Sequence, residues 1–310
     1  MPEMTIDTGR PVMVTGATGF VGGAVVRRLL ARGIDVRALA RPGSDTCNLD
    51  GLDAERAAGD VTDPGSLARA CAGCTHVYHV AADYRLWVPD PARMHAVNVD
   101  GTRNVLDVLA GCDALDLFSY ISTAYVSGKR TGLIYEDDLV HGDGFKNYYE
   151  ETKYHAEVLV QDRMDAIPTV VFRPGIVVGD SRTGETSKFD GPYFILQALR
   201  KLPSVTLMTK VGSGQNTVNL VPVDFVIEAM AYLAQSEHAG TVFHLTDPHP
   251  MTTQDILELF TDLMEMRAAF IPVPPRLART LMQTGLGQYL GISPELIDYF
   301  DHPARYDSRH

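Results

Sequence analysis

Three glycines at a predicted strand-to-helix turn constrain the fold more than any other feature of the chain. Gly16, Gly19 and Gly22 recur every third residue between a β-branched segment at 11–15 and a segment with helical spacing at 20–32. Such a turn lets the backbone approach a diphosphate closely and directs the amides of the helix N-terminus at the anion. We therefore expect a dinucleotide to bind at this turn, within a parallel α/β sheet.

Short β-branched segments alternate with amphipathic helical segments as far as residue 174, which is the pattern of βαβ units. Asp63 followed by Pro64 is typical of a helix N-cap and first turn. The alternation predicts a Rossmann-like, doubly wound parallel sheet. We expect strands at 11–15, 35–40, 55–59, 76–81, 117–123 and 169–174, and helices at 20–32, 64–71, 92–109 and 148–164.

The alternation weakens after residue 174. A polar, glycine-rich segment at 179–192 predicts a loop, and the proline-rich segment 270–278 is expected to lead into a helical hairpin. Between them we expect helices near 193–200 and after residues 222 and 253, and strands near 218 and at 240–246. We divide the chain into a dinucleotide-binding domain, 1–174, and a small C-terminal region, 175–310, that completes the sheet and caps a substrate site.

Composition excludes several classes of function. With 39 acidic and 27 basic residues the net charge is −12, which argues against nucleic-acid binding because that requires a basic surface. No apolar run is long enough to span a membrane and no signal-peptide pattern is present, so we expect a cytoplasmic protein. Cys71 and Cys74 form the only C-x-x-C, and without a second pair we expect structural thiols and no metal.

The glycine spacing G-x-x-G-x-x-G, together with Tyr149-x-x-x-Lys153, resembles the extended branch of the short-chain dehydrogenase/reductase superfamily. Further motifs follow in order along nearly the whole chain: GDVTD at 59–63, HVAA at 79–82, NVDGTRN at 98–104, ISTAYVSG at 121–128 and RPGIVVG at 173–179. The resemblance implies a nicotinamide dinucleotide and a catalytic set of Thr123, Tyr149 and Lys153, with Ser122 in support.

The residue types of this set suit proton transfer. Tyr149 and Lys153 are four apart on one face of a predicted helix, so both can address one ligand. We expect the ammonium to lower the phenol pKa from its usual value near ~10, which makes Tyr149 a general acid or base. The Thr123 hydroxyl, at the carboxyl end of a predicted strand, can bond the same substrate oxygen as charge develops.

The resemblance also implies a set of dinucleotide contacts: Gly16, Thr18, Gly19, Phe20, Val21, Gly22, Arg41, Asp60, Val61, Ala81, Ala82, Tyr149, Lys153, Pro174, Gly175 and Ile176. Arg41 follows the second predicted strand where no acidic residue stands, which favours NADP(H) over NAD(H). NAD(H) stays the alternative, since Arg41 could instead stack on the adenine. We expect Asp60 to meet the adenine edge, and the alternative is a turn carboxylate.

The residues around the catalytic set indicate which reaction the chain catalyses. Sugar dehydratases have acidic residues after the active threonine, whereas Thr123 is followed by Ala124 and Tyr125. Nucleotide-sugar epimerases commonly have polar residues where this chain has Ile-Val-Val at 176–178. Segments 179–193 and 218–226 resemble the male-sterility/thioester-reductase group. Segments 79–91 and 98–106 resemble hopanoid-associated epimerase-like and dihydroflavonol-reductase-like members.

We interpret the chain as an NADPH-dependent reductase of a hydrophobic carbonyl or acyl thioester. The alternatives are an NAD-dependent nucleotide-sugar epimerase and a non-catalytic, dinucleotide-sensing regulator, although such regulators typically lack the tyrosine or lysine. Tyr84, Trp87 and Tyr125 are expected to line the substrate pocket, with packed core as the alternative for these aromatic residues. By analogy alone, the helices around Asn98 and Tyr149 would form a homodimer interface.

Overall fold

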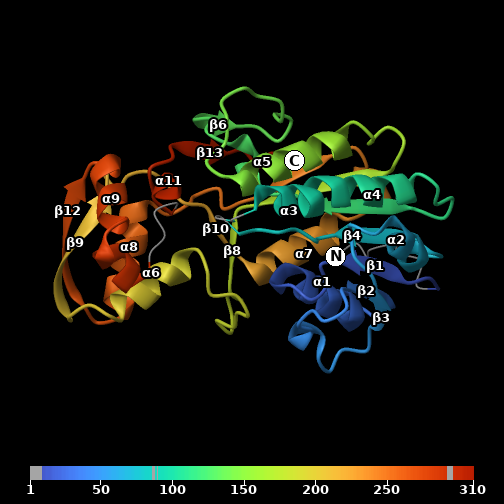
Figure 1. Ribbon diagram of the computed structural model, residues 1–310, viewed down its shortest axis with the longest axis horizontal. Coiled ribbons are helices and arrows are strands. Elements are labelled where there is room, and N and C mark those ends of the chain that lie inside the picture. The colour runs from blue at the N-terminus through green and yellow to red at the C-terminus, as the bar shows by residue number, and fades with distance from the viewer. Residues whose placement is uncertain (1–8, 86–87, 89, 292–295) are drawn as a thin grey trace.

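Seven parallel strands form the central sheet of the protein (Figure 1). The structure is a computed structural model that describes residues 9–85, 88, 90–291 and 296–310. In sheet order the strands are β11 (Val242–Leu245), β7 (Thr169–Pro174), β5 (Leu117–Ile121), β4 (His76–His79), β1 (Val12–Thr15), β2 (Val36–Ala40) and β3 (Glu55–Ala58). The order reverses beside β1, which gives the doubly wound, Rossmann-like sheet predicted from the sequence.

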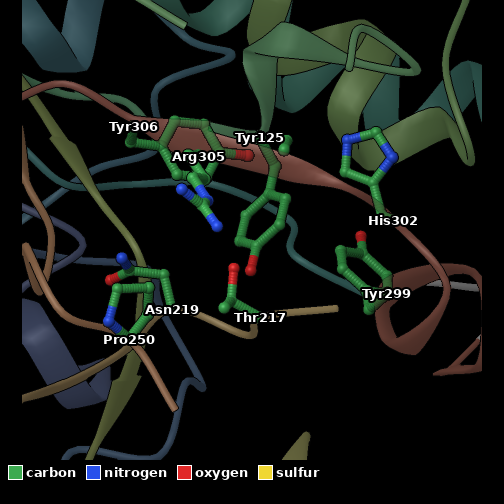
Figure 2. Close-up of a pocket in the computed structure, with 9 residues that line it drawn as sticks. Tyr125, Thr217, Asn219, Pro250, Tyr299, His302, Arg305 and Tyr306 are labelled. Atoms are coloured by element: carbon green, nitrogen blue, oxygen red, sulfur yellow. The ribbon is translucent and has the colours of Figure 1, made fainter. Parts of the chain in front are cut away.

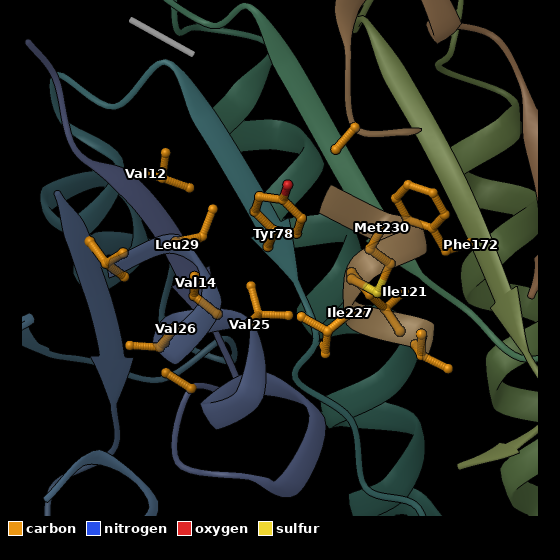
Figure 3. Packing of buried hydrophobic residues seen from close by; sticks show 14 of the residues in the cluster. Val12, Val14, Val25, Val26, Leu29, Tyr78, Ile121, Phe172, Ile227 and Met230 are labelled. Carbon is orange, nitrogen blue, oxygen red and sulfur yellow. The ribbon is translucent and has the colours of Figure 1, made fainter. Parts of the chain in front are cut away.

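Helices cover both faces of this sheet. Side chains along each strand alternate between the two faces, so each face carries apolar side chains that pack against helices. Val12 and Val14 point into one core with α1 (Phe20–Ala31) and α7 (Val223–Leu233), as Figure 3 shows. Met13, between them, packs into the second core. That core is formed with α2 (Pro64–Cys71), α4 (Gly101–Leu109) and α5 (Tyr148–Gln161).

The helix predicted at 92–109 is continuous but irregular. It runs from α3 (Pro91–His95) through a π-helical turn, η2 (Ala96–Asp100), into α4. The residues at the junctions between its segments keep helical dihedral angles, so the helix continues from one segment to the next. A single π turn of this kind often marks a functional position.

The sequence analysis missed a two-stranded parallel sheet away from the central one. β9 (Val205–Val211) pairs with β12 (Arg267–Val273) beside α6 (Pro192–Leu199) and α8 (Thr253–Leu263), which share a small core with them. Pro272, in β12, would be unfavourable in a central strand but is tolerated in a sheet of two edge strands. Residues 270–273, expected to lead into helices, therefore end a strand, and the helices begin after it with α9 (Pro275–Met282).

Two further strand pairs and several short helices complete the described fold. β8 (Ile176–Val178) pairs with β10 (Leu220–Pro222), and β6 (Gly132–Ile134) pairs with β13 (Ala304–Tyr306). The short helices are η1 (Cys47–Leu49), η3 (Ala124–Ser127), η4 (Ser236–His238), α10 (Gly285–Leu290) and α11 (Ile297–Phe300). None of the helices in the described ranges has the length and apolar character needed to cross a bilayer.

Two buried histidines should make the fold sensitive to acid. Burial lowers the pKa of His79 to about 3 and that of His244 to about 4, whereas each would titrate near 6.5 when unfolded. Below pH 6.5 the unfolded chain therefore binds more protons than the folded one. We expect each histidine to remove roughly 1.4 kcal/mol of unfolding free energy per pH unit as the pH falls from 6.5 towards 4.

Urea unfolding between pH 7.5 and 5 measures this dependence. His79→Gln should flatten it, while His249→Gln, at an exposed position, serves as the control and should leave it unchanged. Identical pH profiles for His79→Gln and the parent protein would contradict the assignment.

Candidate active site

The predicted glycine turn lies at the carboxyl edge of the sheet, where the turns after β1 and β4 meet. Gly16 has φ +67°, and a β-carbon there would lie 2.6 Å from the Ala81 nitrogen. A β-carbon on Gly22 would lie 2.1 Å from the Gly16 oxygen. At Gly19 a β-carbon would meet only the Gly16 oxygen, at 3.3 Å, so the outer side of the turn is open. Two glycines thus close the backbone and the third leaves room for a ligand.

The start of α1 suits an anion. Gly19 is its N-cap, no side chain in the described part of the chain caps it, and the first turn carries no acidic residue. The first amides of a helix are otherwise without partners and carry partial positive charge. The turn also contains Thr18, Phe20 and Val21, so these predicted dinucleotide contacts lie at the carboxyl edge of the sheet. The residues present therefore fit the diphosphate of a dinucleotide.

Arg41 lies directly after β2, at the same edge of the sheet. Its guanidinium is exposed and makes no hydrogen bond or ion pair with any described residue. Its backbone oxygen accepts hydrogen bonds from the amide and hydroxyl of Ser44, which close the turn. Asp60 accepts hydrogen bonds from the amide and hydroxyl of Thr62, both at 2.9 Å, so its carboxylate stabilises a turn in this structure.

The other predicted cofactor residues end or follow the neighbouring strands. Val61 is buried, and the Ala81 amide donates to Thr15 Oγ1 at 3.2 Å. Ala82 follows Ala81 in the same loop. Pro174 ends β7 and Ile176 begins β8. Between them Gly175 packs so tightly that a β-carbon would lie 2.7 Å from the Asn219 backbone oxygen.

Tyr149 and Lys153 lie on α5, which packs against η3 and its N-cap residue Thr123. Asn147 caps α5 by accepting a hydrogen bond from the Glu150 amide, which fixes the first turn that carries Tyr149. The Thr123 side chain lies close enough to the Tyr149 hydroxyl to lower its pKa. Lys153 Nζ, one turn further on, donates to the Tyr120 hydroxyl at 2.8 Å and to the Ile121 oxygen at 2.7 Å.

The acid–base behaviour of this group differs from the sequence-based expectation. Burial raises the pKa of Tyr149 to about 12, and the interaction with Thr123 only partly offsets the rise. Burial also lowers the pKa of Lys153 to about 7, against an opposing effect of Glu157. The expected lowering of the Tyr149 pKa by Lys153 is thus wrong for this structure, because Lys153 bonds to β5 and burial dominates.

Asn98, within the π turn η2, positions the loop after β4. Its side chain accepts a hydrogen bond from the Asp83 amide at 2.7 Å and donates to the Asp83 oxygen at 2.9 Å. It also donates to Thr152 Oγ1 on α5, at 2.9 Å. The NVDGTRN motif at 98–104 is recognisable in the sequence, but the role of Asn98 in positioning this loop was not predicted. An asparagine inside a helix, where its propensity is poor, was the available signal.

A buried ion pair lies beneath the catalytic candidates. Arg173 and Glu157 are both fully buried, and Arg173 donates two hydrogen bonds to Glu157 Oε1. The other oxygen of Glu157 accepts from Ser122 Oγ. Ser122 therefore supports Thr123 through this pair rather than facing a ligand. No local pattern in the sequence indicates that the arginine of the RPG motif is the partner of Glu157.

The loop that carries Tyr84 and the loop that carries Lys188 and Asp190 meet near Tyr149. Lys188 Nζ lies 3.9 Å from the ring centroid of Tyr84 and 3.2 Å from Asp190 Oδ2. Asp190 also contributes to the raised pKa of Tyr149. Tyr84 is half-exposed at this junction. Trp87, the other aromatic residue expected there, lies outside the described residues.

Tyr125 lines a small pocket beside the catalytic candidates (Figure 2). Its ring packs edge-on against Tyr299 and Tyr306, with centroids 5.1 and 6.0 Å away. Asn147, the cap of α5, donates to the Tyr299 hydroxyl at 2.9 Å, so the pocket is tied to the helix that carries Tyr149. The other lining residues are Thr217, Asn219, Pro250, His302, Ala304 and Arg305.

Most of this pocket escaped the sequence analysis. Its walls come from 217–219 and 299–306, and only Tyr125 was predicted. The concentration of Tyr, His and Arg in YFDHPARY, 299–306, was the signal available.

Comparison with known proteins gives one family model and several relatives. Residues 14–230 match the model of the male sterility protein family. A 4-hydroxy-2-methyl-3-oxo-4-farnesyl-3,4-dihydroquinoline-1-oxide ketoreductase from Stigmatella aurantiaca is 28% identical over 91% of this chain and 81% of its own. A 2-alkyl-3-oxoalkanoate reductase from Shewanella oneidensis is 30% identical over 79% of this chain and 64% of its own. A sterol demethylase protein B from Methylococcus capsulatus is 47% identical, over 54% of this chain and about half, 51%, of that relative.

Solved structures share the fold. The terminal R domain of the myxalamid PKS-NRPS pathway superposes with a TM-score of 0.77, covering 100% of this chain and 85% of its own at 24% identity. A short-chain dehydrogenase/reductase superfamily protein from Agrobacterium tumefaciens, with bound NAD, gives 0.68 over 92% of this chain and 96% of its own at 22% identity.

Proposed function

Because the chain belongs to the male sterility protein family and has the fold of the extended short-chain dehydrogenases/reductases, we propose that it is an NADPH-dependent reductase of a hydrophobic ketone. The observation that carries the proposal is that the Thr123 side chain lies close enough to the Tyr149 hydroxyl to lower its pKa, with Lys153 on the same helix as Tyr149. These three side chains stand at the sheet edge that also carries the open glycine turn.

The protonation state of Tyr149 supports catalysis in the direction of reduction. With a pKa of about 12 the phenol is protonated at neutral pH, as a proton donor must be. The alkoxide left by addition of a hydride to a ketone is a much stronger base than this phenolate, so Tyr149 can protonate it. Thr123 Oγ1 can hydrogen-bond the same oxygen while its negative charge develops.

Lys153 suits a binding and orienting role. Its amine makes two hydrogen bonds to β5, and an ammonium has a third donor for a ribose hydroxyl of the dinucleotide. When bound, the dinucleotide supplies the hydride from its nicotinamide ring. Proton transfer then rests on Tyr149 and Thr123, whereas Lys153 holds the ligand in place.

Two observations support a hydrophobic ketone as substrate. Ile-Val-Val at 176–178 stands where nucleotide-sugar epimerases commonly have polar residues. A sugar packed against these side chains would leave hydroxyl groups unpaired, at about 1–3 kcal/mol each. The names of the Stigmatella and Shewanella relatives describe reductases of alkyl- or prenyl-bearing ketones, in line with this substrate class.

NADPH oxidation, measured against medium-chain ketones, medium-chain acyl-CoA thioesters and UDP-sugars, tests the proposal. We expect turnover with the ketones. The resemblance of segments 179–193 and 218–226 to the thioester-reductase group makes acyl thioesters the second candidate, so these form a separate arm of the assay. Epimerisation of a UDP-sugar without consumption of NADPH would overturn the reductase assignment.

The preference for NADPH depends on Arg41 in this proposal. Its free guanidinium, at the end of β2, can pair with the 2′-phosphate through charge-assisted hydrogen bonds. We expect Arg41→Ala to weaken NADPH binding roughly ten- to a hundredfold and to leave NADH binding nearly unchanged. Fluorescence titration with both dinucleotides measures the two affinities. Equal losses for NADPH and NADH would mean that Arg41 contacts the adenine or supports the loop instead.

A further inference from the structure

We propose that the pocket beside Tyr125 binds a carboxylate carried by the ketone substrate, with Arg305 and His302 as its hydrogen-bond donors. The proposal rests on the proposed function, since it assigns a second recognition group to the same substrate. It narrows the substrate class from hydrophobic ketones to oxo acids.

Arg305 supplies a positive charge at the mouth of the pocket. It lies on β13, which pairs with β6 in a fixed register, Arg305 opposite Leu133. Its guanidinium makes no hydrogen bond or ion pair with any described residue, and Figure 2 shows it directed into the space between Asn219 and Tyr125. A planar guanidinium with five donors matches the geometry of a carboxylate.

His302 supplies a donor inside the pocket. Only 9% of the residue is exposed, and its buried Nε2 has no partner among the described residues. A buried polar atom without a partner is costly, so a ligand that satisfies it gains affinity. Burial and the charge of Lys146 lower the pKa of His302 to about 4, so the ring is neutral at pH 7 and can carry a proton on Nε2.

The hydroxyl groups in the pocket divide into engaged and available ones. The Tyr299 hydroxyl accepts a hydrogen bond from Asn147, and the Tyr306 hydroxyl bonds with Ser127 Oγ at 3.2 Å. The Tyr125 hydroxyl, in contrast, has no partner in the described part of the chain and points into the pocket (Figure 2). Three separate elements therefore present donors to the pocket. Tyr125 comes from η3, His302 from the residues after α11, and Arg305 from β13.

Arg305 supplies a positive charge to the pocket, and none of the nine lining residues is acidic. The buried Glu150 carboxylate, which helps to raise the pKa of Tyr125 and Tyr299, is paired with Lys146 at 3.2 Å. Lys146 Nζ lies 5.7 and 5.5 Å from the Tyr125 and Tyr299 rings. Close aromatic walls suit a small planar anion better than a phosphate with its attached nucleotide.

The pocket adjoins the elements that carry the proposed catalytic residues, although none of Thr123, Tyr149 and Lys153 lines it. The Tyr125 amide donates to Thr123 Oγ1 at 3.3 Å, and Tyr299 is bonded to the cap of the helix that begins with Tyr148 and Tyr149. A ketone whose oxygen meets Tyr149 and Thr123 would thus extend towards Arg305. Its carboxylate would take up the unpaired donors.

A matched pair of substrates, 3-oxooctanoate and methyl 3-oxooctanoate, differs only in this charge. We expect Arg305→Gln to raise KM for the acid about tenfold and to leave KM for the ester and both kcat values within about twofold, because a hydrogen bond to a charged group is lost only with the acid. His302→Phe should act in the same direction, and Arg305→Lys should restore part of the effect. Arg309→Gln is the control, since Arg309 pairs with Asp307 instead of lining the pocket.

Direct binding separates this inference from the proposed function. Calorimetric titration with octanoate, which cannot be reduced, should give about tenfold weaker binding for Arg305→Gln than for the parent protein even if neither ketone is turned over. Reduction of both ketones with equal KM values, unaffected by Arg305→Gln, would overturn the carboxylate site while the reductase assignment stands. An effect of Arg305→Gln on octanoyl-CoA but not on octanoate would assign the arginine to phosphate binding and would also overturn it.

Discussion

Tyr149→Phe should reduce the rate of ketone reduction roughly 10²–10⁴-fold, which is the usual contribution of a positioned general acid. The ring and its packing remain, so NADPH affinity should stay within about twofold of the parent value. Lys153→Met should weaken both turnover and NADPH binding, because it removes a donor to the ligand and the hydrogen bonds to β5. Steady-state kinetics combined with fluorescence titration of NADPH separate the two effects.

Tyr148→Phe is the matched control for this experiment. Tyr148 is the preceding residue, 51% exposed, and has Thr152 rather than a lysine four residues on. Its substitution should leave the rate unchanged. A Tyr149→Phe protein that keeps most of its rate would exclude Tyr149 as the proton donor.

Arg173→Met should lower the free energy of unfolding by about 3–5 kcal/mol, because it leaves Glu157 as a fully buried charge without its partner. Arg173 also donates to the backbone oxygens of Glu136 and Asp138, so those acceptors lose a partner as well. Urea unfolding at pH 7 measures the loss.

The double variant Glu157→Gln/Arg173→Met tests the origin of that loss. Removing both charges should recover part of the stability, because the cost arises from the charge left unpaired. If the double variant instead loses further unfolding free energy relative to Arg173→Met, by as much as Glu157→Gln costs alone, the two residues contribute through independent contacts.

The sequence predicts the first half of the fold well because its signals are local. The glycine turn, the six predicted strands and the start of α2 at Asp63 each depend on neighbours within a few residues. β9 and β12 were missed because their pairing joins segments far apart in the chain, and Pro272 argued against a strand.

The same distinction applies to the candidate site. Tyr149 and Lys153 are recognisable because four residues separate them on one helix. Their protonation behaviour cannot be recognised from the sequence, because the pKa of Tyr149 depends on burial and because Lys153 bonds to Tyr120 on β5. Arg305 and His302 reach the site only through the pairing of β13 with β6, which no local pattern in the sequence predicts.

The pairing of β13 with β6 has a consequence for how such proteins diversify. Most aromatic and charged residues that line the pocket belong to one segment, 299–306. The candidates for proton transfer lie elsewhere, on α5 and between β5 and η3. Mutations in that segment can alter the shape and charge of the wall without touching Thr123, Tyr149 or Lys153. Selection for a new substrate could therefore act on eight contiguous codons while an inherited chemistry stays intact.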